Sequence, residues 1–329
     1  MRISRTPLRV SFFGGGTDYP EYYRHHPGAV LGTSIDKYIY INALRLEPFI
    51  GCRYRLSYRV NEEVNSTDEI EHPVFRVVIK EFDLEGGWNF GVMSSLPARS
   101  GLGSSSSFTV GLINLIAHIR GESLTPEELA KGAIHVERGL LSENVGTQDQ
   151  LHAAYGGLRR YDFSGDSWTV TPMRVNPAVR DALNQSMYLI HTGVARYASE
   201  IASEQIKRTS EHAIDRPLAH LYDLAQEACV LLERDDPEFV VREFSRMLDD
   251  GWRTKRELSR CVTTPAIDEL HDELMNSGAL GGKLCGAGGG GFFLAIIPPH
   301  LRERVQSKLK HRTLIPIAMN DAGSTILST

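Results

Sequence analysis

The stretch Pro97-Ala-Arg-Ser-Gly101-Leu-Gly103-Ser104-Ser-Ser-Ser107, here named the serine loop, joins a strand-like run to a helical one. Residues 88–96 have strand character, and the apolar residues of 104–120 recur at helical spacing. Free backbone N–H groups and the dipole at a helix N-terminus attract an anion, and glycines let the backbone come close to it. Serine hydroxyls can contact phosphate oxygens or an accompanying Mg²⁺. The serine loop therefore predicts a phosphate-binding site, with a flexible loop capped by serine as the alternative.

Two further glycine clusters lie at opposite ends of the chain. The N-terminal glycine motif is Phe13-Gly14-Gly15-Gly16-Thr17-Asp18, and alone it indicates either a turn or a functional segment. In the C-terminal glycine motif, residues 286–291, five of six residues are glycine. This motif fits G-x-G-x-x-G, but the apolar run after it is strand-like, whereas a dinucleotide fingerprint must open a helix. The remaining readings are a tight turn or a backbone that approaches a ligand closely.

Length and composition limit the class of protein. The 329 residues suggest two domains or one large one. With 36 Lys plus Arg against 41 Asp plus Glu, the net charge of −5 gives no basic footprint for nucleic acid. The four cysteines form no C-x-x-C pair, which fits a reducing compartment. No apolar run is long enough to span a bilayer. We therefore expect a cytoplasmic protein that binds neither nucleic acid nor membrane.

The hydrophobic pattern predicts several elements outside these motifs. Apolar residues at helical spacing predict a helix after His72, and Thr125-Pro-Glu-Glu128 predicts a capping box at the start of another. Residues 187–191 read as a strand. The polar, periodic segment 197–258 predicts two long helices, broken near 235–237. A domain boundary between residues 160 and 190 is plausible from the change in pattern.

Taken together, the three motifs resemble those of the GHMP kinases, the family of galactokinase, homoserine kinase and mevalonate kinase. The matching segments are Pro7–Asp18, the serine loop, and Lys283–Gly291, in the family's order. The resemblance implies an α+β fold of two domains. The first would be similar to ribosomal protein S5 domain 2 and would cover residues 1–175. The second would be ferredoxin-like and would cover residues 176–329.

Within the family, the segments 5–20, 34–38 and 96–107 are most similar to sugar-1-kinases, and more narrowly to D-glycero-D-manno-heptose 7-phosphate kinases. Galactokinases usually carry Gly-Glu-His where this chain has Gly14-Gly15-Gly16. This departure argues against galactose and leaves room for a bulkier sugar. The resemblance implies ATP-dependent phosphorylation of the anomeric hydroxyl, which would give a 1,7-bisphosphate for nucleotide-activated heptose and surface polysaccharide synthesis.

Two alternatives stay open at this point. One is another sugar-1-kinase, fucokinase-like or mannose-type, and the other is a non-catalytic sensor of sugar and ATP with the same fold. In each reading the partner is a small-molecule sugar or sugar phosphate, and a homodimer is left open.

The resemblance also assigns roles to residues. Glu137, and Asp149 in Gly146-Thr-Gln-Asp149-Gln150, are separated by 149 − 137 = 12 positions, as in the family's metal-binding Glu and catalytic Asp. Asp149 would act as general base beside Arg9, and Mg²⁺ would be held by Glu137 and Ser105, with the choice among the neighbouring serines open. The expected ATP-binding residues are Pro97, Ser100, Gly101, Leu102, Gly103, Ser104, Ser105 and Ser106. The expected substrate-binding residues are Gly14, Gly15, Gly16, Thr17, Asp18, Gly286, Ala287, Gly288 and Arg196, with Arg24 as a second candidate for a distal phosphate.

Overall fold

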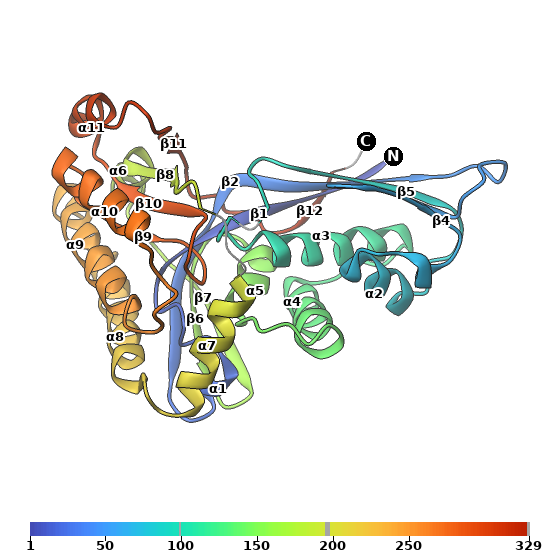
Figure 1. The fold of residues 1–329 in the computed structure, drawn as a ribbon, viewed down its shortest axis with the longest axis horizontal. Helices are drawn as coiled ribbons and strands as arrows, with labels where there is room; N and C mark the ends of the chain where they lie inside the picture. Colours follow the sequence, from blue (N-terminus) through green and yellow to red (C-terminus); the bar gives the residue numbers. More distant parts are fainter. Residues whose placement is uncertain (99, 195–197, 328–329) are drawn as a thin grey trace.

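A computed structural model describes residues 1–98, 100–194 and 198–327, which form two β-sheets with helices around them (Figure 1). The first sheet has eight strands in the order β12-β1-β2-β5-β3-β4, with β6 paired to β2 and β7 to β6. Its strands are β1 (Arg2–Phe13), β2 (Gly28–Arg45), β3 (Tyr54–Ser57), β4 (Asn61–Val64), β5 (Trp88–Ser94), β6 (Leu158–Ser164), β7 (Ser167–Pro172) and β12 (Thr325–Leu327). The second sheet has the order β11-β8-β10-β9, with strands β8 (Met187–His191), β9 (Gly281–Leu284), β10 (Phe292–Ile296) and β11 (Ile315–Pro316).

The helices form two groups around the sheets. In the first group, α2, α3 and α4 lie along one face of the long strands β1, β2 and β5 (Figure 1). In the second group, α9 and α10 contact β9 of the second sheet, whereas α8 contacts α9 and strands β1 and β2 of the first sheet. The first group comprises α1 (Pro20–Tyr23), α2 (Pro73–Glu81), α3 (Ser104–Ile119), α4 (Pro126–Ile134) and α5 (Gln148–Tyr155). The second comprises α6 (Pro177–Ser186), α7 (Ala198–Ser210), α8 (Asp215–Leu231), α9 (Pro237–Lys255), α10 (Pro265–Ser277) and α11 (Arg302–Lys308). Short 3₁₀ turns span Thr67–Glu69 and Pro299–Leu301, and a π-helical turn spans His135–Leu140.

Strand β2 is the longest element of the first sheet because its β-branched and aromatic residues favour extended backbone. Its first half pairs with β6 and its second half with β5, while β1 runs antiparallel to it with two register shifts. At the end of β1, the rings of Phe12 and Phe13 each contact the Phe244 ring of α9 edge-on, with centroids 5.0 Å apart. This packing fixes the N-terminal glycine motif, which follows directly, between the two sheets.

Several predicted elements are confirmed. The helix after His72 is α2, the helix that starts in the serines is α3, and the strand at 187–191 is β8. The capping box is present, because Thr125 and Glu128 each accept a hydrogen bond from the other's backbone N–H. The apolar run after the C-terminal glycine motif is strand β10 and not a helix. This agrees with the prediction that the motif is not a dinucleotide-binding fingerprint.

The prediction of two long helices over 197–258 is wrong, because the segment contains three helices. Helix α7 ends at Ser210 and α8 begins at Asp215. The turn between them carries no glycine or proline, and His212 adopts a left-handed backbone with φ +55°. The polar periodicity continues through the turn, and the local sign of the break is Pro217, which is accepted in the first turn of α8 but would disrupt the interior of one continuous helix.

The domain division at residue 175 stays a prediction. Strands β1 to β7 precede it and β8 to β11 follow it, but β12 returns to pair with β1, which brings the two termini close together (Figure 1). Within the described ranges, no helix combines the length and the apolar character needed to cross a membrane.

Candidate active site

A cavity of about 490 Å³ opens in front of the N-terminus of α3, between residues of the first and second sheets and their helices. All three glycine-rich segments contribute to its wall. Expected site residues that line it are Arg9, Gly15, Gly16, Asp18, Gly101, Gly103, Ser104, Ser105, Ser106, Asp149, Gly286, Ala287 and Gly288. The cavity therefore joins the segments that the sequence separates by more than 250 positions.

The serine loop enters α3 through two glycines with left-handed backbone, Gly101 (φ +76°) and Gly103 (φ +71°). Gly103 is the N-cap, and no side chain caps the helix. The first-turn N–H groups therefore lack an intrahelical or side-chain acceptor at the edge of the cavity. Donors in this arrangement, together with the helix dipole, suit phosphate oxygens.

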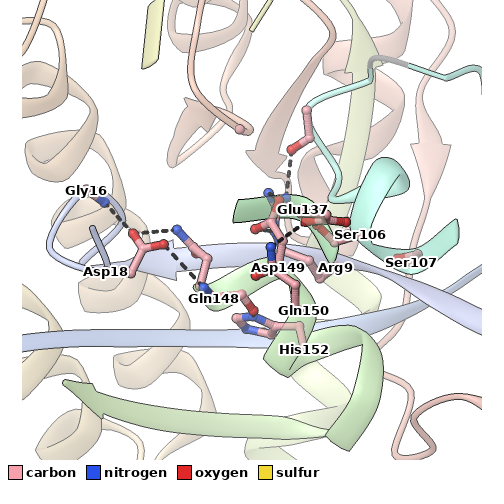
Figure 2. A network of polar contacts seen from close by, with 12 residues as sticks. Arg9, Gly16, Asp18, Ser106, Ser107, Glu137, Gln148, Asp149, Gln150 and His152 are labelled. Atoms are coloured by element: carbon pink, nitrogen blue, oxygen red, sulfur yellow. Dashed lines mark hydrogen bonds and ion pairs between the residues drawn. The ribbon is translucent and has the colours of Figure 1, made fainter. Parts of the chain in front are cut away.

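Arg9 and Asp149, which both line the cavity, form a two-point ion pair (Figure 2). Arg9 Nε donates to Asp149 Oδ1 at 2.8 Å and Nη2 donates to Oδ2 at 2.7 Å. Arg9 Nη1 also donates to the Gly101 carbonyl at 2.7 Å, which ties the pair to the serine loop. Arg9 is buried, whereas 27% of the Asp149 side chain is exposed. The carboxylate is therefore held in place and can still be reached from the cavity.

Glu137 lies behind Ser106, on the π-helical turn that follows α4. Ser106 Oγ donates to Glu137 Oε2 at 2.8 Å, and Gln150 Nε2 donates to the same oxygen. Ser106 is buried and lines the cavity, whereas Ser105, the serine expected beside Glu137, is exposed and makes no such contact among the described residues.

The surroundings of Glu137 fit a magnesium ion. Burial raises the pKa of Glu137 to about 7, and the hydrogen bonds from Ser106 and Gln150 offset this rise only in part. Its Oε1 has no hydrogen-bond partner within the described part of the chain. An unpartnered carboxylate oxygen beside a serine hydroxyl is a set of hard donors that Mg²⁺ accepts.

Asp18 also lines the cavity and is fully buried; it lies apart from the Arg9–Asp149 pair and next to Gln148 (Figure 2). Its Oδ1 accepts hydrogen bonds from Gly16 N at 3.0 Å and from Gln148 Nε2 at 2.9 Å. Burial raises the pKa of Asp18. Gly146 must be a glycine, because a Cβ there would lie 1.9 Å from Asp18 Oδ2. This carboxylate is positioned for hydroxyl groups of a ligand.

The C-terminal glycine motif packs directly on the serine loop. A Cβ on Gly286 would lie 2.5 Å from Gly101 Cα, and a Cβ on Gly291 would lie 2.5 Å from the Ser100 carbonyl oxygen. Phe292 N donates to that same carbonyl at 3.1 Å. Glycine is therefore needed here for backbone-to-backbone approach, and a mere tight turn does not describe the segment.

Some expected residues take other positions. Gly14, Thr17, Pro97, Ser100, Leu102 and the expected metal ligand Glu137 are not among the described residues that line the cavity. Thr17 Oγ1 lies 2.8 Å from the Gly14 carbonyl oxygen and accepts from Ala29 N, so it holds the turn. Arg24 pairs with Asp166 at 3.0 Å on the surface, and Arg196 lies outside the described residues.

Two lysines of the cavity wall, Lys255 and Lys283, have no role that their sequence motifs predict. Lys255 ends α9, and Lys283 lies in β9. Lys283 stands three positions before Gly286 and could have been noticed there, but nothing in the sequence around Lys255 connects it to the glycine motifs.

Comparison with known proteins agrees with this geometry. Residues 70–157 match the family "GHMP kinases N terminal domain", and residues 237–314 match "GHMP kinases C terminal". A D-glycero-alpha-D-manno-heptose 7-phosphate kinase of Campylobacter jejuni is 26% identical over 309 residues, which cover 90% of this chain and 89% of that protein. A bifunctional fucokinase/GDP-fucose pyrophosphorylase of Arabidopsis thaliana is 24% identical over 91% of this chain, and the chain spans 30% of that protein's length.

The fold also has close counterparts among solved structures. The crystal structure of a D-glycero-D-manno-heptose 1-phosphate kinase from Bacteroides thetaiotaomicron has a TM-score of 0.80 at 24% identity, and the match covers 100% of this chain and 99% of that one. The expected two-domain α+β fold is thereby confirmed. Motif order, fold and both family matches show that this chain belongs to the GHMP kinase family of ATP-dependent phosphotransferases.

Proposed function

We propose that this kinase phosphorylates the anomeric hydroxyl of D-glycero-D-manno-heptose 7-phosphate. The observation that carries the proposal is the Arg9–Asp149 pair, which lies in one cavity with the N-terminus of α3 and with Asp18. The Campylobacter jejuni relative, 26% identical over nearly the whole length of both chains, supports the heptose acceptor. The product would carry phosphates at C1 and C7.

The chain supplies the parts that phosphoryl transfer needs, namely positioning and compensation of negative charge. First-turn N–H groups of α3 hold the triphosphate of ATP, and Asp149 accepts the proton of the acceptor hydroxyl as general base. Arg9 keeps the Asp149 carboxylate oriented through two hydrogen bonds. Glu137 and Ser106, rather than Ser105, would hold the metal. When bound there, Mg²⁺ neutralises charge on the phosphate oxygens.

The part of the cavity lined by Gly15, Gly16, Asp18 and Gln148 is where we place the sugar acceptor. Asp18, oriented by Gln148, would accept hydrogen bonds from sugar hydroxyls. Gly15 and Gly16 line the cavity where galactokinases usually carry Glu and His. A Cβ on Gly15 would lie no closer than 3.4 Å to its neighbours, so the space of that side chain is available to a larger sugar, whereas a Cβ on Gly16 would lie 3.0 Å from Gln205 Nε2.

Two other functions compete with this proposal. One is a sugar-1-kinase with a different acceptor, and the other is a sensor that binds sugar and ATP without catalysis. A fucokinase-like activity is suggested by the Arabidopsis thaliana relative, and a mannose-type sugar-1-kinase would use the same chemistry. A non-catalytic sensor of sugar and ATP would not need a general base. The two-point contact between Arg9 and Asp149 supports an enzyme.

The test is ADP release from Mg-ATP with a panel of acceptors. The panel contains heptose 7-phosphate, unphosphorylated heptose, L-fucose, D-mannose and D-galactose. Turnover that is highest with heptose 7-phosphate, with the new phosphate on C1 by ³¹P NMR, supports the proposal. A preference for fucose or mannose would replace the acceptor, and ATP binding without turnover on any sugar would favour the sensor.

A further inference from the structure

The positively charged side chains of the cavity wall differ in whether they pair with a carboxylate. Among the described lining residues the cations are Arg9, Lys255 and Lys283. Arg9 is paired with Asp149. Neither lysine forms an ion pair with a carboxylate within the described part of the chain, although both side chains are buried. The part of the cavity beside the C-terminal glycine motif therefore holds two lysines without a direct carboxylate partner, although the charge of Asp18 acts on Lys255.

Both ammonium groups are fixed by backbone carbonyl oxygens. Lys283 Nζ donates to Phe12 O at 2.8 Å, which lies just before the N-terminal glycine motif. Lys255 Nζ donates to Leu284 O at 3.2 Å and to Gly286 O. Each ammonium has three N–H bonds. The contacts made with described residues use one in Lys283 and two in Lys255, which leaves three N–H bonds for a ligand.

Such a pair is costly unless a ligand compensates it. Burial, and then the neighbouring charge of Lys283, lower the pKa of Lys255 to about 7. Burial, with a smaller contribution from Arg9, lowers the pKa of Lys283 to about 8. Two buried like charges disfavour each other, whereas a dianion between them would be attracted to both. If the two lysines only filled space, apolar side chains of similar volume could replace them without loss of stability.

We propose that Lys255 and Lys283 form a phosphate-binding pair that holds a phosphate group of a reactant between the N-terminal and C-terminal glycine motifs. This rests on the proposed kinase function and adds that the part of the cavity beside the C-terminal glycine motif selects an anionic group. The phosphate has two sources, the acceptor's own terminal phosphate and the phosphoryl group in transfer. Arg24 and Arg196, the candidates from the sequence, are not needed for either.

The first experiment needs no sugar. Binding of inorganic phosphate is measured by calorimetry on the full chain saturated with Mg-ADP, in the wild type, Lys283→Met and Lys255→Met. Lys80→Met, an exposed lysine of α2, is the matched control. Loss of a hydrogen bond to a charged group predicts a phosphate Kd about 10- to 100-fold weaker in both cavity variants and unchanged in the control. Lys283→Met is the primary variant, because it releases a single carbonyl oxygen.

The second experiment separates the two phosphate sources. Kinetics are compared for heptose 7-phosphate and for unphosphorylated heptose. If the pair binds the acceptor's phosphate, Lys283→Met raises KM about 10- to 100-fold for the first acceptor and leaves the second unchanged. If the pair binds the phosphoryl group in transfer, kcat falls for both acceptors.

Either kinetic pattern supports the pair, provided that Lys283→Met keeps the thermal midpoint of the wild type. Two outcomes overturn it. One is a wild-type Mg-ADP complex that binds no inorganic phosphate, and the other is variants whose phosphate Kd stays within about threefold of the Lys80→Met control. Because the phosphate titration uses no sugar, it remains valid when the acceptor panel identifies a different sugar.

Discussion

Asp149 offers its carboxylate to two N–H groups of Arg9 and still exposes part of its side chain to the cavity. Asn at this position retains one acceptor oxygen, but its amide nitrogen faces an Arg9 donor and cannot take a proton. We therefore expect Asp149→Asn to lower kcat by about 10²–10⁴-fold, the usual contribution of a general base. Steady-state kinetics with Mg-ATP measure the loss, and an unchanged circular dichroism spectrum serves as the folding control. Turnover close to that of the wild type would assign the base to another group.

The residues that sequence reasoning finds are those that local pattern encodes. Arg9, Asp149 and the glycines stand in short motifs, and the structure brings them to one cavity. The choice between Ser105 and Ser106 is different. Successive helical residues point about 100° apart, so the serine that faces Glu137 depends on where α3 begins. Four consecutive serines contain no information on that point. Lys255 is missed because only tertiary packing brings α9 to the glycine motifs.

At the scale of elements, the turn that carries Glu137 shows how a helix can be predicted and its geometry missed. The capping box at Thr125 predicts the helix correctly, and α4 follows. The chain then widens into a π-helical turn, in which Leu141 N donates to Val136 O five residues back. π-turns occur often at functional sites. This one places Glu137 beside Ser106, and its hydrogen-bond register depends on the buried partners rather than on propensity.

Helices α9 and α10 are joined by a histidine whose charge contributes to stability. His271 Nε2 lies 2.6 Å from Asp249 Oδ1, and this hydrogen bond is the main cause that raises the pKa of His271. A raised pKa in the folded state stabilises fully below the unfolded value, about 6.5, and this contribution is lost as pH rises through the folded value. We therefore expect His271→Gln to lower the free energy of unfolding more at pH 5.5 than at pH 9.

Urea unfolding at the two pH values measures this difference. His300→Gln, at an exposed histidine, is the control for replacing a histidine side chain by glutamine. A penalty for His271→Gln that is the same at pH 5.5 and pH 9 would show that the ring contributes by packing and not by its charge.

At the scale of the whole molecule, the two sheets meet at the phosphate site itself. The serine loop follows the first sheet, yet Ser100 O accepts a hydrogen bond from Phe292 N at the start of β10. A second link between the sheets is the hydrogen bond from Lys283 Nζ of β9 to the carbonyl of Phe12 at the end of β1. The cavity therefore exists only when both halves are docked, and the glycine clusters at its seam permit that docking. The glycine spacing predicted contact with a ligand, but the contact of glycine with glycine requires the tertiary structure.

The crossing of Gly286 over Gly101 makes this docking testable. In Gly286→Ala, the added Cβ would lie 2.5 Å from Gly101 Cα, and the residue would keep an unfavourable φ of +69°. Gly121→Ala is the matched control, because its φ is +82° and nothing lies within 4 Å of the added Cβ. Both variants should lose about 1–2 kcal/mol of stability through the left-handed backbone. Only Gly286→Ala should also displace the serine loop and lower kcat/KM for ATP, on the order of 10²-fold for a shift near 1 Å. Unfolding curves and ATP kinetics separate the two effects, and equal kinetics in both variants would mean that the seam does not shape the ATP site.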